Sequence, residues 1–136
     1  MEKREAIRAG ILGLVVGDAL GVPYESARRS HMEAFPAEGM VGFGSHYQPR
    51  GTWSDDSSMV LATMASFAER GCIDPEDIMY MFCRWLYQGH FTAHGRRPCG
   101  TAIRRWGREG HSRGVAERYG LEGLSGGSRH PLRRRG

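Results

Sequence analysis

The sequence lacks long apolar runs, since none approaches the roughly 20 residues that a membrane-spanning helix needs. Its first ten residues, MEKREAIRAG, mix acidic and basic side chains and lack the apolar core of a signal peptide. No segment alternates apolar and polar residues over the length of a strand, which argues against a β-sheet. We therefore expect an all-α fold, a cytoplasmic location and no membrane partner.

Cysteine is scarce. Cys72, Cys83 and Cys99 have spacings that match no zinc or redox motif. An odd number of cysteines, in a chain without a signal sequence, favours reduced thiols over a disulfide framework. We interpret Cys72 and Cys83 as packing residues.

Acidic residues are scarce toward the end of the chain. Residues 1–95 hold 8 Lys and Arg against 12 Asp and Glu, a net charge of −4, whereas residues 96–136 hold 11 Arg against 3 Glu, a net charge of +8. The overall charge of +4 therefore comes from a degenerate Arg/Gly-rich segment, 96–136, which we separate from 1–95. A basic binding module is one alternative for this segment. Arginine without interleaved aromatics or a recognisable fold argues only weakly for nucleic acid, so we expect no nucleic-acid partner.

Apolar residues at helical spacing predict three helices. The first covers about Glu2–Leu20 and ends at Val22-Pro23, because proline disfavours helical geometry in the residue before it. The second starts at Ser54–Asp56 and stops at Gly71, with Met59, Val60, Thr63 and Phe67 facing inward. The third has Asp74 as N-cap, Pro75 at its first position and Gly89 at its end, with an apolar stripe of Ile78, Met81, Phe82, Trp85 and Leu86.

The regions between and beyond these helices are less regular. Residues 26–53 are predicted to form a long loop, which is uncommon in a compact domain unless it serves a site. The sequence also allows a short helix near Thr101–Gly107, and residues after about Gly107 are expected to add nothing to the core. Within the first helix, Gly10, Gly13, Gly17 and Gly21 lie along one side, which suggests that another backbone or a ligand approaches closely there.

Asp55 and Asp56 are the most informative pair of polar residues. Adjacent carboxylates repel each other unless a cation, a helix end or solvent compensates. With the Ser54 hydroxyl beside them, they offer the oxygen ligands that hard divalent cations prefer. The alternative is that Ser54 or Asp55 simply caps the second helix, whose positive end suits acidic side chains. Asp18 lies late in the first helix, where an acid is unfavourable, and we assign it a structural role that ties the Leu20–Tyr24 turn to its neighbours.

Two segments, GDALGVPYE (17–25) and TWSDDSSM (52–59), taken in this order, resemble the site motifs of the ADP-ribosylglycohydrolases. The resemblance implies an all-helical fold with a two-metal centre, usually Mg²⁺ or Mn²⁺. Ser54, Asp55 and Asp56 would be metal ligands, and Glu25 would be the acid that orients or activates the attacking water. The substrate would be ADP-ribose or an ADP-ribosylated acceptor. We expect the loop to fold back over the first helix, so that Asp55 and Asp56 face the same cleft as Glu25.

The sequence also departs from that family. No DxD(S/T) motif follows, no Asp occurs after Asp77, and no Gly-Asn-Gly-type motif is found. We therefore expect a truncated chain that is weakly active or inactive, and the alternative is a non-enzymatic fragment or pseudoenzyme of the same ancestry. His90 and His94 are bracketed by glycines, so we do not assign them as a helical metal pair. The sequence does not indicate an oligomeric state.

Overall fold

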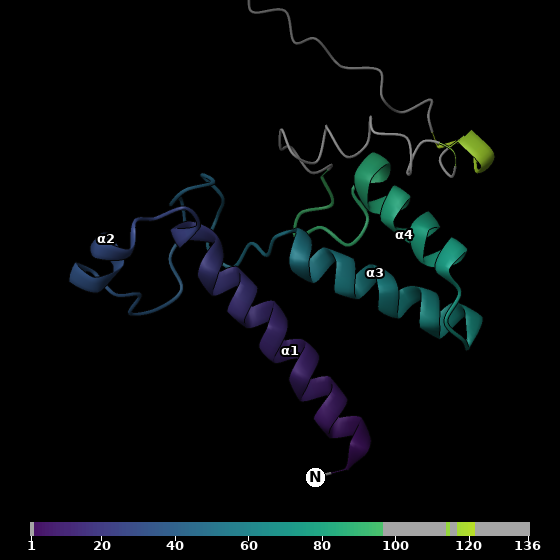
Figure 1. Cartoon of the computed structure of the whole chain (residues 1–136), viewed down its shortest axis with the longest axis horizontal. Coiled ribbons are helices and arrows are strands. Elements are labelled where there is room, and N and C mark those ends of the chain that lie inside the picture. Colours follow the sequence, from purple (N-terminus) through teal and green to yellow (C-terminus); the bar gives the residue numbers. More distant parts are fainter. Residues whose placement is uncertain (1, 97–113, 115–116, 122–136) are drawn as a thin grey trace, which may run out of the picture.

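The structure is a computed structural model, and it describes residues 2–96, 114 and 117–121. In this part of the chain the regular elements are all helical, as predicted, and none is a strand. Figure 1 shows their arrangement: α3 and α4 lie side by side, while α1 approaches α3 only at its C-terminal end. The elements in chain order are α1 (Lys3–Gly21), the 3-10 helix η1 (Val22–Tyr24), α2 (Arg29–Ala34), α3 (Asp55–Arg70) and α4 (Pro75–Gln88).

The ends of α1 follow from local sequence. Glu2 is the N-cap, and its side chain and that of Glu5 form a reciprocal capping box with the backbone. At the other end the chain tightens into η1, with Pro23 inside this turn. The predicted limits, Glu2–Leu20, are therefore confirmed to within one residue at each end.

The helices α3 and α4 form an antiparallel pair whose ends were also predicted correctly. The Ser54 hydroxyl caps α3, and Gly71 ends it in the left-handed conformation with φ 67°. Asp74 caps α4 by accepting hydrogen bonds from the backbone N–H groups of Glu76 and Asp77, and Gly89 ends it with φ 78°. Short-range cap chemistry therefore determines where both helices start and stop.

The surface of α3 that packs inward differs from the predicted one. Met59, Val60 and Thr63 are only half-buried, and Phe67 is 42% exposed. The buried residues of α3 are small: Ser57, Ser58, Ala62 and Ser66. In α4, by contrast, Met81, Trp85 and Leu86 are buried as predicted, whereas Ile78 and Phe82 are half-buried. Small residues on α3 leave room for the large side chains of α4, which periodicity alone does not reveal.

The predicted loop 26–53 contains a short helix that the sequence reasoning missed. It is α2, whose six residues have no buried member. An exposed ion pair between Arg29 and Glu33, one helical turn apart, lies on its surface. Because α2 has neither an apolar stripe nor a side-chain cap, it left no periodic signal in the sequence.

Part of the basic segment packs on α4, which corrects the expectation that nothing after about Gly107 joins the core. Leu121 is only 5% exposed and packs with Cys83, which is fully buried. The rings of Tyr119 and Tyr80 lie 4.5 Å apart between centroids. Burial raises the pKa of the Cys83 thiol to about 11, as suits a packing residue.

Other predictions about the thiols and the basic segment have different outcomes. Cys72 is exposed, so its assignment as a packing residue is wrong. Cys99 and the possible helix near Thr101–Gly107 lie outside the described residues.

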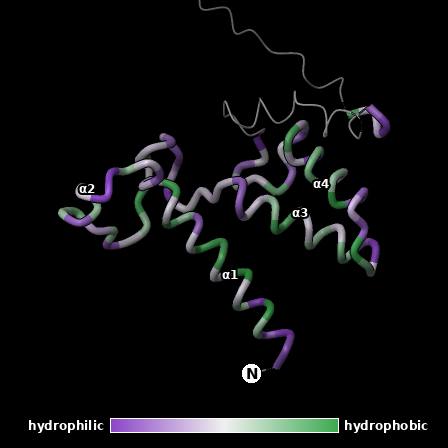
Figure 2. The backbone as a smooth tube through the Cα atoms, viewed as in Figure 1, coloured by the Kyte–Doolittle hydropathy of each residue, from purple (hydrophilic) through white to green (hydrophobic). Residues whose placement is uncertain are grey.

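The segment Lys3–Tyr24 is long and apolar enough to cross a membrane by length and composition. This corrects the expectation that no apolar segment comes near that length. The error arises because four glycines divide the apolar side chains without adding a polar one, and Figure 2 shows hydrophobic residues recurring along α1. Core helices of soluble proteins and signal sequences meet the same two conditions. The cytoplasmic location and the lack of a membrane partner therefore stay predictions.

Candidate functional site

The predicted metal ligands lie at the N-terminal end of α3. Ser54 is the N-cap, and its hydroxyl oxygen accepts a hydrogen bond of 3.2 Å from the backbone N–H of Asp56. Asp55 and Asp56 form the first turn, and both side chains are exposed to solvent. The capping role that the sequence allowed for Ser54 is therefore real. It leaves both carboxylates in the positive field of the helix end.

Asp18 joins α1 to this end of α3. Its Oδ2 atom accepts hydrogen bonds from the backbone N–H groups of Ser54 (2.9 Å) and Ser57 (3.1 Å) and from the Ser57 hydroxyl (2.5 Å). Burial raises the pKa of the Asp18 carboxyl, but these hydrogen bonds outweigh burial and lower the pKa overall. The role of Asp18 is structural, as predicted, but its partners are in α3 rather than in the Leu20–Tyr24 turn.

Glu25 directly follows η1, and the glycine-rich loop folds back onto it. The Ser45 hydroxyl donates hydrogen bonds to the carbonyl oxygens of Glu25 and Pro23, and His46 Nε2 contacts Glu25 Oε2. Gly44 makes this approach possible, because a Cβ there would lie 2.0 Å from the Pro23 carbonyl oxygen. The loop therefore reaches the turn that follows α1, and it presents the Glu25 carboxylate about half exposed (46%). The cleft that Glu25 would share with Asp55 and Asp56 stays a prediction.

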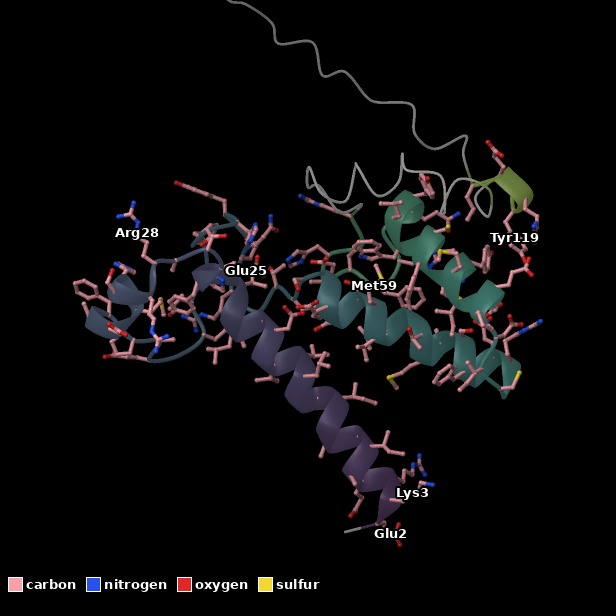
Figure 3. The ribbon with its side chains drawn as sticks, viewed as in Figure 1. Glu2, Lys3, Glu25, Arg28, Met59 and Tyr119 are labelled. Carbon is pink, nitrogen blue, oxygen red and sulfur yellow. The ribbon has the colours of Figure 1, made fainter. Side chains whose placement is uncertain are left out.

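The pKa of Asp56 depends on its surroundings. Burial, followed by the negative charges of Asp55, Asp18 and Glu25, raises the pKa of Asp56. The charge of Glu25 makes the smallest of these contributions, from 31 positions away in the sequence. Figure 3 shows Glu25 beyond the C-terminal end of α1, where this helix comes nearest to the start of α3. We call Glu25, Ser54, Asp55 and Asp56 the acidic site.

The donors of the acidic site fit part of a divalent-cation site. Carboxylates and a hydroxyl are the ligands that hard cations prefer, and a cation would relieve the repulsion that raises the pKa of Asp56. Within 2–96, 114 and 117–121, however, no group of three His, Cys, Asp or Glu side chains converges as a metal-binding set. The groups that suit a divalent cation are therefore the two carboxylates of α3 and the Ser54 hydroxyl.

The residues before α3 connect it to the turn that follows α4. Trp53 Nε1 donates a hydrogen bond of 3.0 Å to the Phe91 carbonyl oxygen, and the Thr52 hydroxyl lies 2.8 Å from His94 Nε2. Trp53 therefore packs the start of α3. His94 therefore has a hydrogen-bond partner before α3.

His90 also has a partner of its own, the Arg84 guanidinium, 2.9 Å from Nδ1. Burial and the positive charge of Arg84 lower the pKa of His90. A neutral imidazole accepting from a guanidinium explains this residue without a metal.

His46 and Ser45 were missed by the reasoning from sequence. Both lie in a loop without periodicity, and their contacts with Glu25 span about 20 residues. Asp18 did leave a signal, because an acid near the C-terminal end of a helix opposes the helix dipole unless it is bonded elsewhere.

Comparisons with known proteins identify the family of the chain. The ADP-ribosylglycohydrolase family model matches residues 1–129, beyond the boundary at residue 95, which stays a prediction. The ADP-ribosylarginine hydrolase Tri1 of Serratia proteamaculans is 30% identical over 95 residues, which are 70% of this chain and 25% of that protein. The ADP-ribosylarginine hydrolase Tri1 of Pseudomonas putida is 30% identical over 108 residues, which are 76% of this chain and 28% of that protein.

A third relative is an uncharacterized protein of Archaeoglobus fulgidus, 33% identical over 86 residues that make up 62% of this chain and 28% of that protein. No solved structure matches the chain. The chain thus spans about a quarter of the length of these curated relatives. Because the family model covers nearly all of its residues, and both site motifs lie within the match, the chain belongs to the ADP-ribosylglycohydrolase family.

Proposed function

We propose that the acidic site binds an ADP-ribosyl group with the help of a divalent cation and hydrolyses the bond between its ribose and a modified acceptor. The observation that carries this proposal is the set of hydrogen bonds that Ser54 and Ser57 donate to Asp18, because these bonds hold the start of α3, with Asp55 and Asp56, beside the end of α1, which the Glu25 motif follows. Two curated relatives are named ADP-ribosylarginine hydrolases, so an ADP-ribosylated arginine is the substrate class that we propose.

Glu25 has the chemistry of a general base in this reaction. A water molecule attacks the anomeric carbon, the bond from that carbon to the arginine nitrogen breaks, and the leaving nitrogen takes up a proton. The Glu25 carboxylate accepts the proton that the water loses. His46 holds Oε2 of Glu25 and so leaves Oε1 for this proton.

Ser54, Asp55 and Asp56 would hold Mg²⁺ or Mn²⁺ beside this base. When bound, the cation supplies positive charge that orients ribose hydroxyls and water at a centre where charge develops. Asp18 contributes by fixing the end of α3 on which both carboxylates lie.

We further propose that this chain by itself turns over slowly. Mg²⁺ and Mn²⁺ favour six oxygen ligands, and the described residues gather two carboxylates and one hydroxyl at α3. A single loosely bound ion orients substrate and water less well than a complete centre does.

The experiment measures binding and turnover together. ADP-ribose binding is titrated by calorimetry in 5 to 10 mM Mg²⁺, on the order of a weak protein site, and release of ADP-ribose from an ADP-ribosylated arginine peptide is followed in parallel. We expect binding that is lost in Asp55→Asn/Asp56→Asn. We also expect slow release that Glu25→Gln reduces at least tenfold while ADP-ribose still binds.

The matched control is Glu76→Gln/Asp77→Asn, because these two acids occupy the first turn of α4 as Asp55 and Asp56 occupy that of α3. This control should behave as the wild type. Absence of ADP-ribose binding, or binding that both pairs of substitutions affect equally, contradicts the proposal. The chain would then be a non-enzymatic member of the family.

A further inference from the structure

One side of α1 carries apolar and small residues that nothing in the described part of the chain covers. Ala19 is the buried residue of α1, whereas four of its large apolar side chains are 40 to 57% exposed: Ile7, Leu12, Leu14 and Val16. From Ala9 to Gly21 the only charged or polar side chain is Asp18, and this one is bonded to α3. We call the uncovered set the outer face of α1: Ile7, Gly10, Leu12, Gly13, Leu14, Val16, Gly17 and Gly21.

The four glycines of the outer face border open space. A Cβ added at any of them would meet no atom within 4 Å outside the helix backbone. Glycine destabilises a helix interior relative to alanine, so four glycines in one row weaken α1. No packing contact within the described residues compensates for this loss. A row of glycines is favourable where another backbone packs closely against the helix.

The outer face is too wide for one neighbouring helix. With 3.6 residues per turn, the positions from Leu12 through the glycine row to Ile7 extend around more than half of the circumference of α1. A helix that is apolar nearly all round is a buried helix of a larger structure. The side toward α3, with Val15, Asp18 and Ala19, accounts for only the remaining part.

We propose that the outer face of α1 is a docking surface for helices that correspond to the remaining three-quarters of the relatives' length. The chain matches 25 and 28% of the two ADP-ribosylarginine hydrolases, so about three-quarters of each lies outside the matched region. The proposal rests on family membership and not on hydrolytic activity. The docking helices would contribute apolar residues that fill the space above the glycine row.

Two other occupants fit the structure less well. A bilayer would have to accept Asp18, because this carboxylate lies within the apolar segment and holds the N-terminal end of α3 beside it. A second copy of the chain would bring another glycine row. Two such rows meet at one crossing point and leave Leu12 and Val16 on the far flank exposed.

The test joins the full chain with the ADP-ribosylarginine hydrolase of Serratia proteamaculans, from which the quarter matched by this chain has been removed. The two are co-expressed and analysed by size-exclusion chromatography with light scattering, and the Pseudomonas putida protein serves as a second partner. We expect a one-to-one complex with at least one of them. Leu12→Glu/Val16→Glu should abolish it, whereas Ile73→Glu, at another exposed apolar residue, should leave it intact.

A second variant separates docking from simple stability. Gly17→Ala places its Cβ in open space in the chain by itself, so it should raise the melting temperature of the isolated chain. If helices pack closely on the glycine row, the same substitution should weaken the complex at least tenfold. If the glycine row has no partner, Gly17→Ala should raise the melting temperature without weakening the complex.

Three results would overturn the proposal. The first is no complex with either partner. The second is a homodimer that Leu12→Glu/Val16→Glu dissolves. The third is binding to vesicles of phosphatidylcholine and phosphatidylglycerol, lost in the same variant, without any complex.

Discussion

Asp18 of α1 and Ser57 of α3 are joined twice through one carboxylate oxygen: the backbone N–H and the hydroxyl of Ser57 both donate to Asp18 Oδ2, at 3.1 and 2.5 Å. Ser54 donates to the same atom from its backbone. A side chain of one helix thus provides N-terminal capping for another helix. Because α1 and α3 approach each other at this end, these bonds determine where Asp55 and Asp56 lie relative to the end of α1.

Replacing Asp18 tests this connection. Asp18→Ala removes three acceptor contacts and should lower the free energy of unfolding by about 2 kcal/mol. Asp18→Asn retains an oxygen in the same place and should lose less than half as much. Urea denaturation measures both, with Glu33→Ala on exposed α2 as a control expected to be within about 0.5 kcal/mol of wild type. Equal losses in Asp18→Ala and Asp18→Asn would show that charge, not the acceptor oxygen, matters.

The same carboxyl predicts how stability depends on pH. The pKa of Asp18 is below its usual value of 3.8 in the folded chain, so the unfolded state binds a proton more readily. The stabilisation by Asp18 is therefore complete above pH 3.8 and is lost as the pH falls through the lower folded value. The difference in unfolding free energy between wild type and Asp18→Asn should shrink in acid. A difference that stays constant from pH 6 to about 3 would contradict this account.

Gly44 is predicted to be the position that brings the loop to Glu25. A Cβ there would lie 2.0 Å from the Pro23 carbonyl oxygen, so Gly44→Ala must push the backbone apart and cost about 1 to 3 kcal/mol. Gly39→Ala is the control, since its Cβ would meet nothing within 4 Å. Hydrogen exchange of the Ser45 amide, which donates to Pro23, should accelerate only in Gly44→Ala. Unchanged exchange would show that the loop does not depend on this close approach.

Leu121 tests whether the basic segment contributes to the core. Its side chain is 5% exposed against Cys83, so Leu121→Ala should destabilise the chain by about 2 to 5 kcal/mol. Ile73→Ala, at a side chain 75% exposed, should change stability by less than about 0.5 kcal/mol. Thermal unfolding compares the two variants. If both behave as wild type, the segment is an appendage, as the sequence alone suggested.

Local chemistry made much of this fold predictable. Ser54, Gly71, Asp74 and Gly89 each act on backbone within a few residues, so the limits of α3 and α4 can be read directly from the chain. The side of α3 that faces inward could not be predicted in this way, because small serines face inward and Phe67 faces out. Which residues of α3 are buried depends on the size of the α4 side chains that pack against them.

The candidate site also has features that the sequence indicates and features that it does not. The motifs around Glu25 and Asp55 indicated which residues to consider, and the roles of Glu25 as base and of Ser54, Asp55 and Asp56 as ligands remain predictions. The contact of His46 with Glu25 depends on how a loop closes over 21 residues, and no sequence pattern encodes that closure. The packing of Leu121 on Cys83 is equally long-range and was missed.

The most direct test of whether Asp55 and Asp56 hold a metal ion is the binding of Mn²⁺. Binding is measured by the electron paramagnetic resonance signal of the ion that remains unbound. We predict one weakly bound ion in the wild type, at least tenfold weaker binding in Asp55→Asn/Asp56→Asn, and unchanged binding in Glu76→Gln/Asp77→Asn. The last variant removes an equivalent acidic first turn from α4, so it controls for attraction of cations to any such pair. Equal binding by all three proteins, or none by the wild type, would contradict the assignment of α3 as the metal-holding end of the site.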